Sequence, residues 1–383
     1  MPDKFIPYGR QCIEDDDIEA VVEILKSDWL TTGPKVSEFE DKFCSFAGSQ
    51  YAVAVSSGTA ALHCAAFAAG IKPGDEVIVT PMTFAATANV VLYQGGIPVF
   101  ADIEPDTLLI DPEVVRQKIT SRTRAIICMD YGGQPCDYDE LKAISTENKL
   151  ILIADSCHSA DASYKHTPTG TLADITAFSF HPVKHITTGE GGMVTTNNPD
   201  FAERARRFRN HGITTDHRQR SEAGTWYYQM IDLGFNYRIS DFQCALGMSQ
   251  LKKLKKWVDR RNEIAARYNR GLSGIEGLKI LRTKPDRLHS FHLYVVKIKA
   301  TEFGMNRNEL FNFMRKNQVG VNVHYVPVHL HPFYRKTLGT EPGMCPVAEE
   351  TYEDILSLPM YPTMTDEDVE YVIKTIWKAK RKA

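Results

Sequence analysis

The sequence predicts an α/β protein with a mainly parallel sheet in a large domain and a smaller α/β domain at the C-terminal end. From residue 51 onward, short apolar runs alternate with helical stretches. Strands that are joined by helices form parallel sheets covered on both faces. A chain of 383 residues is long enough for both domains, which we place at residues 1–250 and 251–383.

The composition argues against several classes of protein. Hydrophobic residues make up 43% of the chain and charged residues 24%, as in ordinary globular proteins. A net charge of -3 gives no reason to expect nucleic acid or a membrane surface as a partner. The eight cysteines form no C-x-x-C pair, which favours free thiols in the cytoplasm over disulfides or a zinc site. Residues 52–71 lack charges, but hydroxyl residues and His63 interrupt them, so we expect no membrane span.

The first 50 residues are predicted to form two helices with a loop between them. The first helix covers residues 14–27 and has one apolar face, made of Ile18, Val21, Val22 and Leu25. The second begins at about Lys35 and ends at Gly48, because glycine readily adopts the backbone conformation that terminates helices. The loop from Trp29 to Pro34 carries an aromatic ring and two hydroxyls.

The alternating region contains five predicted strands, at residues 51–55, 76–80, 98–102, 124–129 and 150–154. Helices are predicted near residues 59–69, 83–94, 111–119 and 137–147. Two further strands, at 174–180 and 192–196, flank a loop that is rich in Thr and Gly.

That loop contains Lys184, and the strand at 150–154 is followed directly by Asp155. A lysine amine can condense with the aldehyde of pyridoxal phosphate (PLP), and a carboxylate can keep the ring nitrogen of PLP protonated. Ligand sites in α/β sheets gather beyond the carboxyl ends of the strands, where both residues are predicted to lie. Taken alone, Lys184 is better explained as an ordinary loop lysine, and only the surrounding motifs favour a cofactor site.

The stretch from Ser56 to Leu62 follows a predicted strand and opens an Ala-rich helix. The free N–H groups and the dipole of a helix N-terminus favour an anion, and Ser57 and Thr59 add hydroxyl donors for a phosphate. Taken alone, this motif is better explained as an ordinary N-cap. Phe84 follows the strand at 76–80 and either stacks on a planar cofactor or belongs to the core.

The C-terminal third begins with a long helical run from about Ser240 to Arg270, which leads into the small domain. There we predict strands at residues 291–300 and 319–325, and helices near 306–316, 347–355 and 365–380. Residues 214–228 are polar and show no periodicity, which is typical of a mobile loop.

Five motifs in this order resemble those of the DegT/StrS-type sugar-nucleotide aminotransferases: SSGTAAL, TFAATAN, ADSCHSA, SFHPVKHITTGEGG and LGFNYRISDFQCALGMSQL. The resemblance runs through nearly the whole chain. It implies a PLP enzyme with the aspartate aminotransferase fold (fold type I) that aminates ketosugars attached to a nucleotide. It also implies a homodimer with shared active sites.

The resemblance assigns roles to individual residues. Lys184 would bond to the aldehyde carbon of PLP and later carry a proton, while Asp155 would pair with the ring nitrogen and Phe84 would stack on the ring. The phosphate would be held by Ser57, Gly58, Thr59 and Ser179, joined by Asn236 of the partner chain. His158 stands near the ring hydroxyl, where many members have Gln, so its role is less defined.

Within the family, FIPYGRQ at residues 5–11 and HPVKHITTGEGG look most like the branch that serves pseudaminic acid synthesis. That branch forms UDP-4-amino-4,6-dideoxy-N-acetyl-β-L-altrosamine from the matching 4-keto sugar and L-glutamate. The resemblance makes these residues the expected sugar-nucleotide contacts: Tyr8, Asp28, Trp29, Leu30, Thr31, Asn322, Val323, His324 and Tyr325. Aromatic rings and hydroxyls suit a uridine-linked sugar, although Tyr8 and Trp29 are equally suited to anchoring the N-terminal arm.

Other functions were weighed against transamination. An aminotransferase for a D-gluco 4-keto sugar or a 3-keto sugar fits the same motifs. A PLP-dependent sugar dehydratase of the family would have His in place of Lys184, and His185 only neighbours it. A nonenzymatic PLP-binding regulator would carry a DNA-binding segment or a damaged lysine site, and a nicotinamide enzyme would carry G-x-G-x-x-G after a strand. We expect no metal site, and His289, His329 and His331 are expected to pack or to face solvent.

Overall fold

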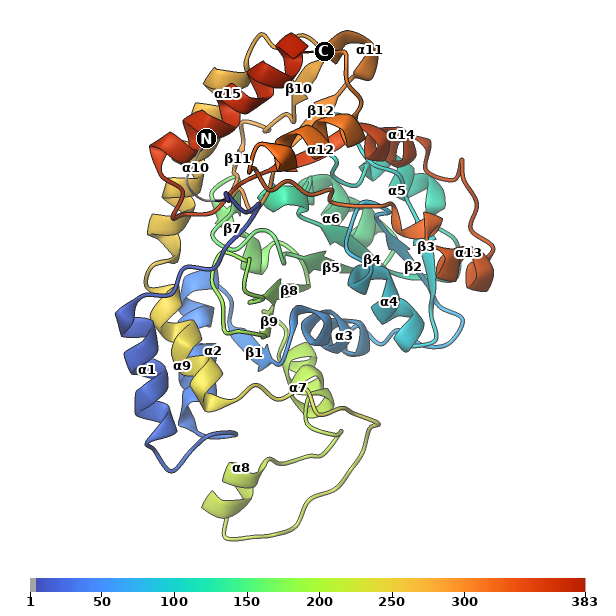
Figure 1. The fold of residues 1–383 in the computed structure, drawn as a ribbon. Coiled ribbons are helices and arrows are strands. Elements are labelled where there is room, and N and C mark those ends of the chain that lie inside the picture. The colour runs from blue at the N-terminus through green and yellow to red at the C-terminus, as the bar shows by residue number, and fades with distance from the viewer. Residues whose placement is uncertain (1–4, 383) are drawn as a thin grey trace.

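The computed structural model describes residues 5–382 and is built around a seven-stranded sheet with helices on both faces (Figure 1). The strands lie in the order β1-β9-β8-β5-β4-β2-β3. Their bounds are β1 Tyr51–Val55, β2 Glu76–Val79, β3 Ile97–Phe100, β4 Thr123–Met129, β5 Ile151–Asp155, β8 Ile175–Ser179 and β9 Gly192–Thr196. All seven strands were predicted, each to within a few residues.

Only β9 runs against its neighbours. It pairs antiparallel with both β1 and β8, whereas every other pair in this sheet is parallel. The carboxyl ends of the six remaining strands therefore lie at one edge of the sheet. This edge brings together the segments that follow β1, β2, β5 and β8, which contain the predicted cofactor residues.

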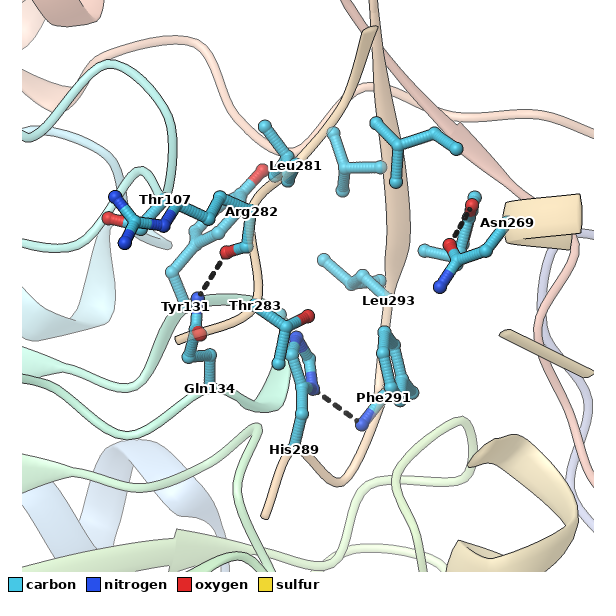
Figure 2. A pocket seen from close by; sticks show the side chains of 14 residues that line it. Thr107, Tyr131, Gln134, Asn269, Leu281, Arg282, Thr283, His289, Phe291 and Leu293 are labelled. Atoms are coloured by element: carbon cyan, nitrogen blue, oxygen red, sulfur yellow. Dashed lines mark hydrogen bonds between the residues drawn. The ribbon is translucent and has the colours of Figure 1, made fainter. Parts of the chain in front are cut away.

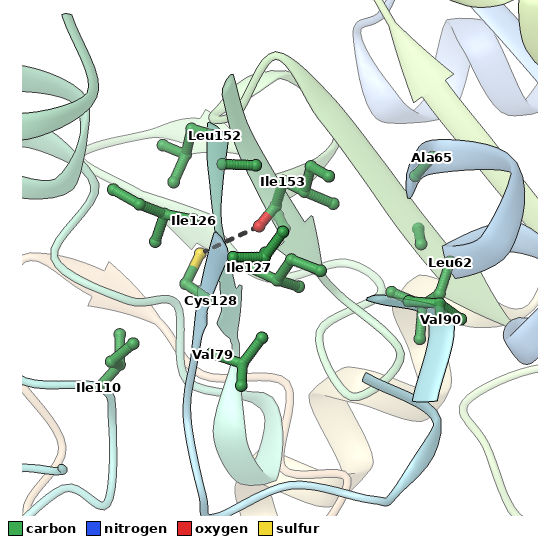
Figure 3. Close-up of a cluster of buried hydrophobic side chains, with 14 of the residues drawn as sticks. Leu62, Ala65, Val79, Val90, Ile110, Ile126, Ile127, Cys128, Leu152 and Ile153 are labelled. Carbon is green, nitrogen blue, oxygen red and sulfur yellow. Dashed lines mark hydrogen bonds between the residues drawn. The ribbon is translucent and has the colours of Figure 1, made fainter. Parts of the chain in front are cut away.

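The helices of this region cover the sheet and form the largest core of the molecule. They are α3 Gly58–Ala68, α4 Ala86–Tyr93, α5 Pro112–Lys118, α6 Tyr138–Glu147 and α7 Pro199–Phe208. Side chains from α3 and α4, including Leu62, Ala65 and Val90, share one buried cluster with strand residues such as Ile127 and Ile153 (Figure 3). Because α3 is rich in alanine, it packs closely against β8 and β9.

Three helices flank the outer edge of the sheet beside β1: α1 Asp15–Leu25, α2 Pro34–Ala47 and α9 Asp241–Leu251. The two predicted N-terminal helices are thus confirmed, and Gly48 ends α2 with a left-handed φ of 72°. The apolar face of α1 points to solvent, with Ile18, Val22 and Leu25 exposed by 54%, 38% and 58%. This helix is instead anchored by the buried Asp17 and Ile24.

The predicted helical run from Ser240 to Arg270 is interrupted, and this prediction was wrong in detail. It forms α9 and α10 Leu254–Leu272, which are separated at Lys252 and Lys253. Lys253 forms ion pairs with Glu14, Asp16 and Asp17 of the N-terminal segment. The break therefore coincides with the contact that fastens α1 to α9.

The C-terminal part is built on a second, antiparallel sheet in the order β10-β12-β13. Its strands are β10 Leu278–Ile280, β12 Tyr294–Ile298 and β13 Ile355–Leu358, and its helices are α11 Ala300–Phe303, α12 Arg307–Lys316, α13 Pro332–Leu338, α14 Pro346–Asp354 and α15 Asp366–Lys382. Residues 319–325 are not a strand as predicted. They make single bridges instead, from Val319 to Ile6 and from Asn322 to Ser357.

The remaining elements are short. A small sheet contains β6 Ser163–Tyr164, β7 Thr167–Pro168 and β11 Arg287–Leu288, and three turns of 3-10 helix are η1 Tyr131–Gly133, η2 Thr169–Thr171 and η3 Val328–Leu330. The polar segment after α7 carries α8 His217–Glu222 and extends away from the body of the molecule (Figure 1). Within residues 5–382, no helix has both the length and the apolar character needed to cross a membrane.

Candidate active site

The lysine loop, residues 180–191, joins β8 to β9 at the carboxyl edge of the sheet. It is closed by hydrogen bonds from Phe180 N to Gly191 O (2.9 Å) and from Thr188 N to Phe180 O (3.0 Å). The backbone N–H of Lys184 donates to His181 O at 2.9 Å. Burial lowers the pKa of the Lys184 amine, which increases the share of the neutral, nucleophilic form near neutral pH.

Asp155 ends β5 and is almost fully buried, with 3% of its surface exposed. Thr87 of α4 donates its hydroxyl to Asp155 Oδ2 at 2.6 Å, and the Thr83 hydroxyl lies 2.6 Å from that of Thr87. The backbone N–H of Cys157 donates to Asp155 Oδ1 at 3.2 Å. The carboxylate is thus held from both sides at the edge where the lysine loop begins.

A cradle for an anion lies at the N-terminus of α3. Ser57 caps this helix by accepting the N–H of Ala60 at 3.0 Å, so the N-cap interpretation of this serine is correct. Within residues 5–382, the N–H groups of Gly58 and Thr59 donate to no other group. A Cβ atom on residue 58 would lie 2.7 Å from Cβ of Ser179, so only glycine lets this turn approach the end of β8. The free N–H groups of Gly58 and Thr59 at the N-terminus of α3 can donate hydrogen bonds to a phosphate.

Three buried histidines surround the side chain of Lys184. His158 follows Asp155 by three residues, His185 follows the lysine, and His292 comes from the segment before β12. The His158 and His292 rings have centroids 4.3 Å apart, and those of His185 and His292 are 5.6 Å apart. Burial lowers the pKa of each of these histidines well below its ordinary value, so all three are neutral near pH 7.

The opposite side of the site is formed by the N-terminal arm and the C-terminal part of the chain. The Tyr8 ring lies 5.6 Å from that of His324, and the Tyr325 hydroxyl lies 3.1 Å from His158 Nε2. Phe84 is 61% exposed, and its ring centroid lies 6.2 Å from that of Tyr325. An exposed aromatic face at this edge fits a planar cofactor ring better than it fits a core position.

The arm is held in place by backbone contacts. The N–H of Ile6 donates to Gln318 O at 2.9 Å, and the N–H of Met360 donates to Tyr8 O at 3.0 Å. Asn322 Nδ2 lies 3.4 Å from His324 Nε2. The structure therefore brings the predicted residues Tyr8, Asn322, His324 and Tyr325 together on one side.

The other predicted substrate residues lie apart from this group. Trp29 and Leu30 are 40% and 49% exposed, Asp28 and Thr31 are also exposed, and Thr31 bridges to Ser240 at the start of α9. Asn236 is exposed too, and its side chain forms no hydrogen bond with the described residues. Its neighbour Tyr237 accepts the N–H of Ser56 at 2.8 Å.

Sequence reasoning missed Thr87 and His292. In the predicted helix near residues 83–94, the spacing of Thr83 and Thr87 would place both hydroxyls on one face, so this signal was available, although in the structure Thr83 precedes α4. His292 carried no comparable signal, because it approaches the lysine from a segment more than 100 residues away in the sequence. Residues 5–382 contain no group of three His, Cys, Asp or Glu side chains that could hold a metal ion.

Comparison with known proteins places the chain in a family. The model of the DegT/DnrJ/EryC1/StrS aminotransferase family matches residues 11–377. The chain belongs to this family. Among relatives of the same length, an uncharacterized protein of Methanocaldococcus jannaschii is 44% identical over 377 residues, covering 98% of each chain. Spore coat polysaccharide biosynthesis protein SpsC of Bacillus subtilis is 41% identical over 374 residues, covering 97% of this chain and 96% of SpsC.

Solved structures agree with the family assignment. Helicobacter pylori PseC, an aminotransferase involved in the biosynthesis of pseudoaminic acid, matches with a TM-score of 0.92 at 30% identity, covering 99% of this chain and 100% of PseC. Spr1654 of Streptococcus pneumoniae, described as a sugar aminotransferase, has TM-scores of 0.92 in its PMP form and 0.91 in its PLP form at 32% identity, covering 98% and 99% of this chain and 99% of Spr1654. The predicted fold type I is confirmed, and so is the resemblance. This DegT/StrS family member is a PLP-dependent sugar aminotransferase.

Proposed function

We propose that this sugar aminotransferase transfers the amino group of L-glutamate to C4 of UDP-4-keto-6-deoxy-N-acetyl-L-altrosamine, as a step in pseudaminic acid biosynthesis. The observation that carries the proposal is the likeness to PseC over 99% of the chain. The arm motif supports it, because Tyr8 lies beside His324 on the side of the site that faces the lysine loop.

A second candidate substrate is another keto sugar nucleotide, with D-gluco configuration at the 4-keto sugar or with a keto group at C3. The identity of 41% with SpsC, a spore coat polysaccharide biosynthesis protein, favours this alternative. Both candidates use the same cofactor residues and differ only in the groups that surround the sugar.

We assign the cofactor contacts to the residues at the sheet edge. When bound, PLP supplies an aldehyde that takes up an amino group and a ring that accepts electrons. Lys184 would bind the aldehyde carbon, and Asp155, which accepts a hydrogen bond from Thr87, would keep the ring nitrogen protonated. Phe84 would stack on the ring, and His158 would stand on the side of the ring hydroxyl. The phosphate contacts are Ser57, Gly58, Thr59 and Ser179.

Lys184 also carries the proton of the reaction. Its amine combines a lowered pKa with surroundings of neutral histidines, so it can accept a proton near pH 7 and return it at a neighbouring atom. The neighbouring side chains of His158 and His292 are themselves buried, which limits the access of bulk water to this amine.

We further propose that the active unit is a homodimer with shared sites. The segment after α8 exposes a series of large apolar side chains, among them Trp226 at 84% and Leu233 at 76%. The exposed stripe of α1 adds to these residues, and exposed apolar patches often mark interaction surfaces. A partner chain would cover these side chains, and would receive Asn236 and the loop of Asp28, Trp29, Leu30 and Thr31 at its own site.

The cysteines support a cytoplasmic location for this proposed enzyme. All eight are free, and Cys64, Cys128, Cys136, Cys244 and Cys345 are buried. Unpaired thiols in this number are typical of a reducing compartment.

The test compares substrates with the purified, PLP-loaded enzyme. With L-glutamate as donor, kcat/KM is measured for the L-altro 4-keto sugar, its D-gluco epimer and a 3-keto sugar. Each polar group left unpaired by a mismatched sugar should destabilise its transition state by roughly 1–3 kcal/mol and so lower its kcat/KM, which leads us to expect a clear preference for the L-altro compound. A preference for the D-gluco or the 3-keto sugar would favour the second candidate and refute the first.

A further inference from the structure

The segment of residues 289–292, which lies between β11 and β12, forms a turn that is fixed from several directions. The N–H of Ser290 donates to Gly133 O at 3.0 Å, and Arg261 Nη1 donates to Phe291 O at 3.1 Å. Phe291 has a left-handed φ of 45°, which is unusual for an aromatic residue. The turn therefore directs the residue that follows Phe291.

That residue is His292, which faces the reacting lysine. Its Nε2 atom lies 3.4 Å from Lys184 Nζ, and only 6% of its surface is exposed. We propose that His292 is a positioning residue, whose neutral imidazole accepts a hydrogen bond from the Lys184 amine and so fixes the direction of the other bonds and the lone pair of that nitrogen. This inference rests on the proposed role of Lys184 as the reacting amine.

The surroundings keep His292 uncharged, as an acceptor must be. Burial lowers its pKa well below the ordinary value, and the neighbouring cations act in the same direction. The titratable and charged groups that face it are Lys184, His158, His185 and Arg261. Arg261 is itself only 1% exposed and donates to carbonyl oxygens, so its charge acts directly on this group of histidines.

The second nitrogen of the His292 ring indicates a functional role. When Nε2 accepts from Lys184, the ring hydrogen lies on Nδ1, and this buried atom has no partner among residues 5–382. An unpaired buried N–H group costs stability, and an apolar side chain of similar size would avoid that cost. The stability lost at Nδ1 is consistent with a residue whose task is to contact the lysine.

His289 in the same turn offers a matched control. Its Nδ1 accepts the N–H of Phe291 at 2.9 Å, and its ring stacks on the Phe291 ring with centroids 3.8 Å apart. It faces a cavity of about 20 Å³ that is also lined by Tyr131 and Gln134 (Figure 2). His289 forms no hydrogen bond with Lys184 in the described structure, so its hydrogen bond and its stacking serve the turn itself and do not reach the lysine.

The experiment measures the Lys184 amine directly in full-length protein freed of cofactor. Competitive labelling with acetic anhydride over a pH series, read by mass spectrometry, gives the pKa and the reactivity of this one lysine. In His292→Leu the pKa of Lys184 should fall by about one unit, because the charged amine loses an acceptor. In His292→Gln, whose amide reaches the same position, it should stay near the wild-type value.

The loaded enzyme provides the second readout. In the half-reaction with L-glutamate, His292→Leu should lower the rate constant about 10- to 100-fold while KM changes by less than about threefold, and His292→Gln should restore most of the rate. Circular dichroism and urea unfolding check that each variant folds. If His292→Leu is unstable, His292→Asn replaces it, because its shorter amide ends before the Nε2 position.

Three outcomes would overturn the role of His292. The first is an unchanged Lys184 pKa and an unchanged half-reaction rate in His292→Leu. The second is an equal loss of half-reaction rate in His292→Leu and His292→Gln. The third is a shift of the Lys184 pKa in His289→Leu that equals the shift in His292→Leu. Failure of the role of Lys184 is seen separately, because Lys184→Ala would then retain turnover, and failure of the proposed substrate is seen in the comparison of sugars, which does not depend on labelling of the histidine variants.

Discussion

At the scale of single residues, Thr87 controls the carboxylate that we assign to the cofactor ring. Its hydroxyl donates to Asp155 Oδ2 at 2.6 Å in a buried setting. Thr87→Val keeps the shape and removes this donor, so we expect cofactor affinity to fall about 10-fold or more with little change in fold, since a hydrogen bond to a charged group contributes about 1.5–3 kcal/mol. Titration of the apoprotein with PLP, followed by absorbance, gives the affinity.

Thr87→Ser is the matched control for this prediction, because it restores the hydroxyl without the methyl group. Equal affinities for PLP in the wild type and Thr87→Val would show that the hydrogen bond does not support the ring contact of Asp155. A loss shared by the Ser and Val variants would assign the effect to packing of the methyl group.

Lys184→Ala should abolish turnover while the chain still folds. The substitution removes both the amine that binds the aldehyde carbon and the proton carrier, so we expect a loss of at least about 10³-fold in kcat. The urea midpoint should stay close to that of the wild type, since Lys184 forms no ion pair within residues 5–382. Turnover near the wild-type rate in this variant would refute the assignment of Lys184.

At the scale of elements, Gly133 lets η1 and the turn at residues 289–292 approach each other. A Cβ atom on residue 133 would lie 2.7 Å from Ser290 Oγ and 2.8 Å from the His158 carbonyl oxygen, and the φ of 107° is unfavourable for other residues. Gly133→Ala should therefore lower the free energy of unfolding by about 2–4 kcal/mol, as measured in urea.

Gly274→Ala provides the comparison for Gly133→Ala. Gly274 has a φ of 81° with no atom near the added Cβ, so only backbone strain of about 1–2 kcal/mol is expected. Equal losses of unfolding free energy in the two variants would mean that the close approach of residue 133 to Ser290 and His158 adds nothing to the backbone strain.

The sequence was most informative where local pattern decides the element. The strand at 51–55 and the helix stop at Gly48 follow from apolar runs and from glycine chemistry, and both were predicted. Residues 319–325 have the composition of a strand, but single bridges to Ile6 and Ser357 take the place of a ladder. Such pairings depend on distant segments, which periodicity cannot reveal.

The candidate site likewise contains some residues that local sequence pattern can place and others that it cannot. The position of Lys184 and Asp155 at one edge of the sheet could be predicted, because Asp155 ends one strand and the lysine loop follows another. The approach of His292 depends on the fold of the turn before it, for which the sequence has no local rule. The division between residues 250 and 251 stays a prediction, although it falls close to the break between α9 and α10.

At the scale of the whole molecule, buried histidines couple stability to pH. Burial lowers the pKa of His63 to about 4 and those of His289 and His324 to about 3, compared with 6.5 for the unperturbed side chain. Unfolding therefore takes up protons below about pH 6.5, so stability is complete above that value and falls as the pH decreases toward 4. Each such histidine should lower the free energy of unfolding by about 1 kcal/mol between pH 7 and 5.5.

Urea unfolding of the apoprotein at these two pH values measures the effect. His63→Gln provides the control, since it removes one titrating group, and we compare the pH dependence of the variant with that of the wild type. The difference between the two pH values should shrink by about 1 kcal/mol in this variant. An unchanged difference would mean that His63 is protonated to the same extent in the folded and unfolded chains.

The proposed sharing of active sites predicts complementation between two inactive variants. Each proposed site takes Lys184 from one chain and Asn236 from the other. A dimer of one Lys184→Ala chain and one Asn236→Ala chain therefore contains one site with both residues intact. Mixing the two variants under conditions that exchange subunits should recover up to about one quarter of wild-type activity for random pairing. Exchange confirmed by mass spectrometry without recovered activity would exclude sharing through Asn236.

In the seven-stranded sheet, the antiparallel strand β9 has a consequence for synthesis of the chain. In the finished sheet β1 pairs only with β9, and the cradle after β1 lies against the end of β8. At ordinary elongation rates, β1 leaves the ribosome about ten seconds or more before β9 does. During that interval β1 and the apolar helix α3 lack the strands that cover them. If these are the cofactor contacts, as we propose, a growing chain can bring the cradle, Asp155 and Lys184 together only after Thr196 has emerged.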